Sequence, residues 1–314
     1  MKILFMGTPD FALFSLKALV EYSKNTDIEI CGVITQPDKP KGRGYALMPP
    51  PVKQYALEVG LNVYQPETLK DGAFLELLES LAPDLIAVVA YGKILPKSVI
   101  DFPKYGCINV HGSLLPEYRG AAPMQRAIID GKDKTGITIM YMAEGLDTGD
   151  MLLTREFPIK ENYNFEDIHD GLGLLGAEML TEIIPMLQNS TATRTPQNDA
   201  LSSYAKKITK EDCLVDFSKD ARTVHNLIRG LSPVPLSFTH TPNGKLLKLI
   251  TSRIADTDTP HECAGEILSL DGSIEIACSK GSIYVDKVLP EGKARMNAAD
   301  FIRGRNISVG DILK

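Results

Sequence analysis

Asn109 and His111 are the polar residues at the end of an otherwise apolar run, Cys107-Ile108-Asn109-Val110-His111. Residues two apart on a strand point to the same side, so these two side chains share a face and Val110 points the opposite way. An amide donates hydrogen bonds, and an imidazole can pass a proton near neutral pH. Ligands of an open parallel sheet bind beyond the carboxyl ends of its strands. The pattern therefore predicts one pocket that holds an amide and an imidazole.

The residues after His111 form a rigid turn. Gly112, Pro116, Gly120 and Pro123 punctuate this segment and fix a bent loop around the histidine. A lone histidine is more often structural. The neighbouring amide and the rigid loop together favour a functional one.

A carboxylate is offered by Asp147 in the acidic loop Ala143-Glu144-Gly145-Leu146-Asp147-Thr148-Gly149-Asp150. Only the fold can bring this side chain to His111. An equally good local interpretation is an Asx-type turn in which Asp147 caps Thr148 and Gly149.

The first glycine turn does not have the pattern of a phosphate loop. Gly7-Thr8-Pro9 follows an apolar run, but Gly-x-Gly-x-x-Gly and Gly-x-x-x-x-Gly-Lys-Ser/Thr are both absent, and Pro9 has no backbone N–H. We interpret it as a strand end that turns into a helix, with Thr8 as the cap and Pro9 at the first helical position. A dinucleotide cofactor is not expected.

The elements that must position these residues alternate in βαβ order. Runs such as residues 85–90 are apolar throughout, as in strands buried on both faces of a helix-covered parallel sheet. The order predicts an α/β fold with a doubly wound, mainly parallel, Rossmann-like sheet. Strands are expected at Lys2–Met6, Ile28–Thr35, Asn62–Tyr64, Leu85–Tyr91, Cys107–Val110, Gly136–Met142 and Met151–Phe157, and helices at Pro9–Tyr22, Val52–Val59, Glu67–Leu81, Met124–Ile129 and Phe165–Leu187.

The length of 314 residues and an apolar share of 44% predict two domains. Periodicity stops between Gln188 and Ser203, where Asn, Ser, Thr, Pro, Gln and Asp take over, so we predict a catalytic domain over residues 1–189, a linker over 190–205 and a second domain over 206–314. Short strand-like segments at roughly ten-residue spacing, after a helix near Ala221–Leu231, predict a small, OB-like β-barrel for the second domain.

Composition narrows the class of protein. No run approaches the roughly 18 apolar residues of a membrane helix, so a soluble cytoplasmic protein without membrane contact is expected. The five cysteines are scattered and contain no Cys-x-x-Cys pair, which predicts neither a disulfide framework nor a zinc site. Residues 1–205 hold 18 Lys and Arg against 26 Asp and Glu, a net charge of −8, whereas residues 206–314 hold 16 against 14, a net charge of +2. The two parts are therefore expected to face different partners.

Two motifs resemble the folate-dependent formyltransferase family. His111-Gly112-Ser113-Leu114-Leu115-Pro116 with Tyr118-Arg119-Gly120-Ala121-Ala122-Pro123 is similar to the signature loop of that family, and Gly145-Leu146-Asp147-Thr148-Gly149 is similar to its second motif. Further matches are Pro37–Gly44, Val52-Lys53, Ala90–Pro96 and Tyr204–Ile208, so the resemblance covers essentially the whole chain. One segment departs from it: Arg229-Gly230-Leu231-Ser232-Pro233-Val234-Pro235 stands where the family has a tryptophan, and this sequence contains no Trp.

The resemblance implies a reaction and its residues. It places Asn109, His111 and Asp147 at catalytic positions, with 10-formyltetrahydrofolate as formyl donor and co-substrate and no metal. Asn109 would donate to the oxygen that gains charge, His111 would move a proton, and Asp147 would orient the ring. The donor would lie against Ser113, Leu114, Leu115 and Pro116, with backbone groups near Tyr91, Gly92 and Ile94 at the edge of the pterin.

The implied acceptor is methionine esterified to initiator tRNA, and the charge pattern agrees. Lys39, Lys41, Arg43 and Lys53 face a single acid, Asp38, in a loop rich in Gly and Pro. A solvated mobile loop is an equally good interpretation. A polyanion near the active site would favour such a loop.

Lys206 and Lys207 begin the basic second domain and are expected to contact an RNA backbone. A monomer is expected. Two alternatives stay open: the same chemistry on an amino sugar or on water, and a folate-responsive or RNA-binding module without turnover.

Overall fold

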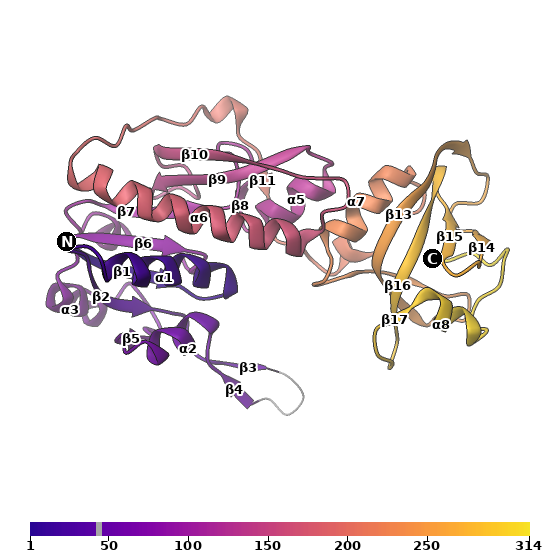
Figure 1. Ribbon diagram of the computed structural model, residues 1–314, viewed down its shortest axis with the longest axis horizontal. Helices are drawn as coiled ribbons and strands as arrows, with labels where there is room; N and C mark the ends of the chain where they lie inside the picture. The colour runs from indigo at the N-terminus through magenta and orange to yellow at the C-terminus, as the bar shows by residue number, and fades with distance from the viewer. Residues whose placement is uncertain (42–45) are drawn as a thin grey trace. The chain divides into compact units, whose positions relative to one another are not determined.

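The computed structural model describes residues 1–41 and 46–314, and the chain divides into two compact units (Figure 1). The first unit comprises residues 1–120, 135–157 and 169–204, and the second comprises residues 121–134, 158–168 and 205–314. The segment predicted as a linker, residues 190–205, thus belongs to the first unit as far as Tyr204. The domain boundaries themselves stay a prediction.

The first unit is built on a seven-stranded sheet in the order β10-β9-β7-β6-β1-β2-β5. The five strands from β7 to β5 are parallel to their neighbours, and β9 is antiparallel to β7. The chain adds β2 and β5 on one side of β1 and then β6 and β7 on the other, so the topological switch point lies between β1 and β6. The strands are β1 (Lys2–Gly7), β2 (Glu29–Ile34), β5 (Val63–Tyr64), β6 (Leu85–Val89), β7 (Cys107–His111), β9 (Lys134–Tyr141) and β10 (Met151–Pro158).

Helices cover both faces of this sheet, which confirms the predicted doubly wound fold. On one face, Gly173 of α6 packs directly against the ring of Phe14 on α1, and Figure 1 shows these two helices side by side. On the other face, Phe74 and Leu78 of α3 share a buried cluster with Met6 of β1. The helices are α1 (Asp10–Ser23), α2 (Pro51–Glu58), α3 (Gly72–Leu81), α4 (Lys97–Ile100) and α6 (Phe165–Gln188).

Two helix starts differ from the sequence prediction. Thr8 does not cap α1, because its hydroxyl donates to the Tyr91 carbonyl oxygen at 3.1 Å; the helix begins at Asp10 after Pro9, without a side-chain cap. The helix expected from Glu67 begins only at Gly72, because the Asp71 side chain accepts the Phe74 N–H at 3.1 Å and fixes the N-terminus there.

Smaller elements complete the first unit. β3 (Lys39–Lys41) and β4 (Ala46–Met48) form an antiparallel pair, and β8 (Arg119–Gly120) pairs with β11 (Tyr204–Ala205). A short 3-10 helix, η1, covers Asp199–Leu201.

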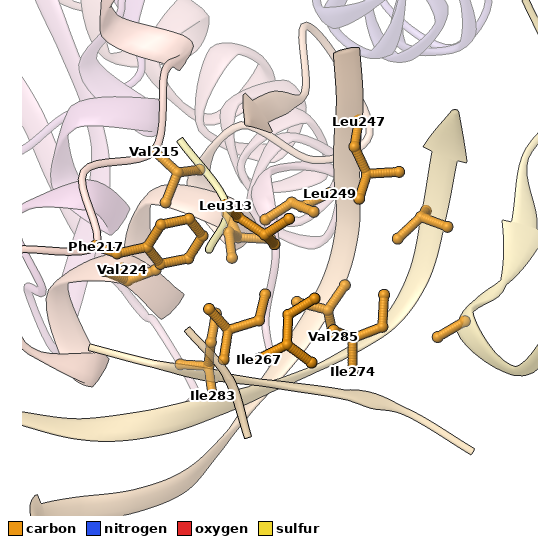
Figure 2. Packing of buried hydrophobic residues seen from close by; sticks show 14 of the residues in the cluster. Val215, Phe217, Val224, Leu247, Leu249, Ile267, Ile274, Ile283, Val285 and Leu313 are labelled. Carbon is orange, nitrogen blue, oxygen red and sulfur yellow. The ribbon is translucent and has the colours of Figure 1, made fainter. Parts of the chain in front are cut away.

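The second unit is built on antiparallel strands in the order β12-β13-β16-β15-β14, with β17 paired to β16. These strands confirm that the second domain is a β domain, as the sequence predicts. Alternate residues of β13 and β16 point into one core, as Figure 2 shows for Leu247, Leu249, Ile283 and Val285 together with Val224 of α7. Its elements are α5 (Pro123–Ile129), η2 (Glu211–Cys213), α7 (Ala221–Gly230), β12 (Ser237–His240), β13 (Leu246–Pro260), β14 (Ile267–Ser269), β15 (Ile274–Ala277), β16 (Lys280–Pro290), β17 (Met296–Asn297) and α8 (Ala298–Arg303).

Over the described part of the chain, none of the helices has the length and apolar character that crossing a membrane requires.

Candidate active site

β7 places Asn109 and His111 on one face of the sheet. Val110 between them packs against Gly176 of α6, so the two polar side chains point to the opposite face, as the strand periodicity predicts. His111 ends the strand and is 6% exposed, whereas Asn109 is half-buried. Among the described residues, no hydrogen bond engages the side-chain amide of Asn109. The amide can therefore donate to a bound molecule.

The imidazole of His111 is held at one nitrogen and open at the other. Its Nε2 lies 3.0 Å from the carbonyl oxygen of Tyr118. A carbonyl only accepts hydrogen bonds, so Nε2 carries the hydrogen in this pair. Nδ1 faces Asp147, whose Oδ2 is 3.7 Å away. Nδ1 is therefore the nitrogen at which the ring can take up or release a proton.

The Asp147 carboxylate is oriented by a distant part of the chain. Its Oδ2 accepts the backbone N–H of Gly120 at 2.8 Å, and the side chain is 11% exposed. The carboxylate thus binds the loop after β7. This contact differs from the alternative interpretation, in which Asp147 caps Thr148 and Gly149 in a local Asx-type turn. Within residues 1–41 and 46–314, no group of three or more His, Cys, Asp or Glu side chains is arranged to hold a metal ion.

Hydrogen bonds to β9 fix the loop after His111. Thr138, which pairs with His111 across β7 and β9, donates its hydroxyl to the Ser113 carbonyl oxygen at 2.8 Å and accepts the Leu115 N–H at 3.1 Å. The Ser113 hydroxyl donates to the Glu117 carbonyl oxygen at 2.7 Å. Of the four loop residues that are predicted to contact the formyl donor, Ser113 and Leu115 are buried. Leu114 and Pro116 are partly exposed, so these two residues can contact the donor.

The other predicted donor residues lie after β6, at the switch point of the sheet. The Tyr91 ring is buried, and burial raises the pKa of its hydroxyl to about 12. Its carbonyl oxygen accepts from the Thr8 hydroxyl and from Gln36 Nε2. Because the ring is buried, the Tyr91 side chain is not exposed to a ligand. Gly92 is exposed and Ile94 is 77% exposed.

Two of the loops carry an exposed apolar side chain. Ile94, on the loop after β6, is 77% exposed, and Leu146, on the loop that carries Asp147, is 50% exposed.

The lysines of the predicted basic loop fall on two kinds of element: Lys39 and Lys41 belong to β3, and Lys53 belongs to α2. Lys39 is exposed, and its ammonium donates to Gln36 Oε1 at 2.7 Å. Lys53 does not serve as a free cation, because its ammonium is bound by Asp38 at 2.8 Å and by Gln65 at 2.6 Å. This ion pair also lowers the pKa of Asp38.

Lys41 and Arg43 are the other two predicted tRNA-binding residues of this loop. Arg43 lies outside the described residues, and Lys41 is described by its backbone alone.

Lys206 and Lys207 are exposed at the start of the last segment of the second unit. Neither lysine forms an ion pair with a described residue. Both remain candidates for contact with a polyanion.

Two family models match the chain. The formyl transferase model matches residues 1–184, and the model of the formyl transferase C-terminal domain matches residues 207–306. The chain belongs to the formyl transferase family. It is an enzyme of this type.

Relatives match this formyl transferase from end to end. It is 49% identical over 312 residues to the methionyl-tRNA formyltransferase of Syntrophus aciditrophicus (strain SB), which covers 99% of this chain and 98% of the relative. It is 47% identical over 314 residues to the methionyl-tRNA formyltransferase of Ruminiclostridium cellulolyticum, which covers 100% of this chain and 99% of the relative.

Solved structures show the same fold at lower identity. An N-formyltransferase from Helicobacter canadensis, solved in complex with folinic acid and dTDP-3-aminofucose, superposes with a TM-score of 0.67. The two are 20% identical over 91% of this chain and 98% of that chain.

Several residues that support the candidate site of this formyl transferase carry no local sequence signal. Thr138 lies inside an apolar strand, and Ser203 and Gln197 lie in the segment interpreted as a linker. Gln197 donates to the Asp147 carbonyl oxygen at 2.9 Å, and Ser203 accepts the Tyr118 N–H at 2.8 Å. Their partners lie 23 to 85 positions away, so no local pattern could reveal them.

The segment Arg229–Pro235, which departs from the family pattern, packs within the second unit. Arg229 donates to the carbonyl oxygens of Lys160 and Tyr163, at 3.1 and 2.8 Å. Leu231 is fully buried in a cluster with Phe238, whereas Val234 is exposed. The segment is therefore held by the buried Leu231 and by the hydrogen bonds of Arg229.

Proposed function

We propose that this formyl transferase moves the formyl group of 10-formyltetrahydrofolate to the α-amino group of methionine on initiator tRNA. The product is N-formylmethionyl-tRNA for translation initiation. One observation carries the proposal: an unengaged Asn109 amide stands beside a histidine that faces a carboxylate, in a chain that matches methionyl-tRNA formyltransferases over its full length.

The side chains suit attack of an amine on a formyl carbon. As the amine attacks, negative charge grows on the formyl oxygen, and the Asn109 amide donates to it. A donor of this kind contributes roughly 3 kcal/mol in comparable sites, because the hydrogen bond strengthens as the charge appears. None of the described residues has to be displaced from the amide first.

His111 moves the proton that the attacking amine must lose. Its Nε2 is committed to the Tyr118 carbonyl, so Nδ1 accepts this proton. The negative charge of Asp147, whose Oδ2 lies 3.7 Å from this nitrogen, stabilises the protonated ring. The proton then passes to the nitrogen that leaves the formyl carbon, so acid and base steps use one ring nitrogen.

The donor fits the exposed groups beyond the strand ends. Leu114 and Pro116 on the loop after β7 are partly exposed, and Ile94 and Leu146 present exposed apolar side chains on two other loops. Flat apolar faces of a pterin suit such side chains, and backbone groups at Gly92 suit its polar edge.

The acceptor side is supported by charge. The β3–β4 pair exposes Lys39, and Lys206 and Lys207 are exposed in a part of the chain with net charge +2. We assign Lys39, Lys41, Arg43, Lys206 and Lys207 to phosphate contacts, and we take residues 206–314 as the RNA-binding domain. Lys53 is left out of this set because Asp38 binds it.

The test is formylation by the purified protein. Given methionyl initiator tRNA and 10-formyltetrahydrofolate, it should produce formylmethionyl-tRNA, detected by acid gel or by mass spectrometry of the released amino acid. Elongator tRNA charged with methionine serves as the matched competitor and should react poorly. Transfer to an amino sugar, release of formate to water, or folate binding without turnover would each contradict the proposal.

A further inference from the structure

We infer that Gln197 is a positioning residue of the formyl-transfer site, and this inference rests on the proposed function. Its side chain joins the loop that carries Asp147 to the loop that follows His111. Gln197 lies in the segment that composition marks as a linker, 50 positions from Asp147.

The amide nitrogen of Gln197 holds the Asp147 loop by its backbone. Nε2 donates to the carbonyl oxygens of Asp147 and Gly149, at 2.9 and 2.8 Å. Asp147 has a φ of 52°, in the left-handed region that few residues other than glycine adopt. The two hydrogen bonds stabilise this conformation from outside the loop.

The amide oxygen of Gln197 holds the other loop. Oε1 accepts from Arg119 Nε at 3.0 Å and from Nη2 at 2.8 Å, and Asp199 binds the same guanidinium at 2.7 Å. Arg119 directly precedes Gly120, whose N–H donates to the Asp147 carboxylate at 2.8 Å. Gln197, Asp147, Gly120 and Arg119 therefore close a ring of hydrogen bonds around the carboxylate that faces His111.

The partners fix which way the Gln197 amide points. Two carbonyls can only accept, so they select the nitrogen, and a guanidinium can only donate, so it selects the oxygen. The segment is also anchored on both sides of Gln197. Thr195 pairs with Met151 through two backbone hydrogen bonds of 2.9 Å, and the Ser203 hydroxyl accepts the Tyr118 N–H at 2.8 Å.

Loss of the Gln197 donors should act on chemistry more than on binding. The Asp147 backbone would relax from its left-handed conformation, and its carboxylate would move from His111 Nδ1. The two loops carry Leu114, Pro116 and Leu146, which are assigned to the donor, but none of the lysines assigned to RNA. The expected signature is a lower kcat with a smaller rise in KM for the folate and with KM for tRNA nearly unchanged.

The decisive variants are Gln197→Glu and Gln197→Ala, with Asn198→Ala as the matched control. Asn198 lies in the same segment, is exposed, and caps only η1 through the Ala200 N–H. Gln197→Glu keeps the acceptor for Arg119 and replaces the donor with a second oxygen, which faces two carbonyls. We expect both Gln197 variants to lower kcat by about 10- to 100-fold, the usual effect of misplacing a catalytic group. Asn198→Ala should keep the wild-type kcat.

Two readouts separate positioning from general structural support. The kcat of Gln197→Glu, relative to wild type, should recover as pH falls, because a protonated Glu regains a donor. In an Asp147→Asn background, Gln197→Ala should cost less than about threefold, because two residues that act through one group are not additive.

Several outcomes would overturn the inference: wild-type kcat in Gln197→Ala, equal losses in both backgrounds, a raised KM at constant kcat, or no recovery of Gln197→Glu at low pH. If Gln197→Ala fails to fold, Gln197→Glu and its pH response decide alone. If the wild type makes no formylmethionyl-tRNA, the proposed function fails and this inference falls with it. Normal wild-type turnover with unaffected Gln197 variants overturns the inference alone.

Discussion

His111 in the first unit and His225 in the second are both buried, at 6% and 5% exposure, but their surroundings differ. On α7, His225 Nδ1 lies 2.9 Å from the Ser252 hydroxyl, and burial lowers the pKa of His225. At the end of β7, His111 Nδ1 faces a carboxylate at 3.7 Å, and the amide two residues away is unengaged among the described residues.

The different surroundings of His111 and His225 show where a functional site can form in this fold. Buried polar groups normally have their hydrogen bonds satisfied, and the α7 site follows that rule. Donors and acceptors left open at a strand end are held there by surrounding contacts, and they can act on a substrate. Substitutions in each of the two units test this difference.

The largest expected effect separates the two histidines by activity. Asn109→Ala should lower kcat by about 100- to 1,000-fold, as loss of an oxyanion donor does, and His111→Ala should lower it at least as much. His225→Ala should keep the kcat of the folded enzyme while lowering its thermal stability. Steady-state formylation and thermal unfolding of the same preparations measure both. A loss of kcat in His225→Ala as large as that in His111→Ala would end the comparison.

A cavity in the core of the second unit should affect stability alone. Leu249 is fully buried beside Leu247 and Val285 (Figure 2). Leu249→Ala should lower the free energy of unfolding of this unit by about 2–5 kcal/mol, from lost burial and the cavity left behind. Urea unfolding followed by circular dichroism measures the change. Leu214→Ala, at a 44% exposed position, is the control and should change little.

Lys39 on β3 and Lys53 on α2 should differ in their contribution to the affinity for the tRNA acceptor. Lys39→Ala removes an exposed cation and should reduce the slope of log affinity for tRNA against log salt by about one. Lys53→Met removes a cation already bound by Asp38, so the slope should hold. Filter binding at several salt concentrations measures the slopes. Equal slope changes in the two variants would argue against the assignment of Lys39.

The smallest expected effect is an opposite pH response of two histidines. The hydrogen bond to Asp10 raises the pKa of His169 on α6 above 6.5, with a smaller contribution from Asp170. Its stabilising contribution is therefore present below pH 6.5 and lost as pH rises through the folded-state pKa.

For His225, burial is the main cause of the lowered pKa, and the charge of Arg229 adds to it. The neutral ring stabilises the second unit above pH 6.5, and this contribution is lost as pH falls through the folded-state pKa. Calorimetric melting of His169→Gln and His225→Gln between pH 5 and pH 8 should show deviations from wild type that grow in opposite directions. Parallel trends in the two variants would contradict the assignment.

Much of the fold could be predicted from local patterns because they have local causes. Apolar runs gave β1, β6 and β9 to within two residues, and the 3.6-residue periodicity gave α6 and α7 to within one. The start of α1 was predicted to within one residue, but its cap could not be predicted, because the Tyr91 carbonyl, 83 positions away, binds the Thr8 hydroxyl that was expected to cap the helix.

The candidate site divides in the same way. Strand periodicity by itself determined that Asn109 and His111 share a face, and motif resemblance pointed to Asp147 and to formyl transfer. Only the tertiary structure decided that Asp147 faces His111 Nδ1, that Asp38 neutralises Lys53, and that residues 195–203 hold the site loops. The physical reason is range: side-chain alternation is a property of neighbouring residues, whereas these hydrogen bonds and ion pairs join residues 15 to 85 positions apart.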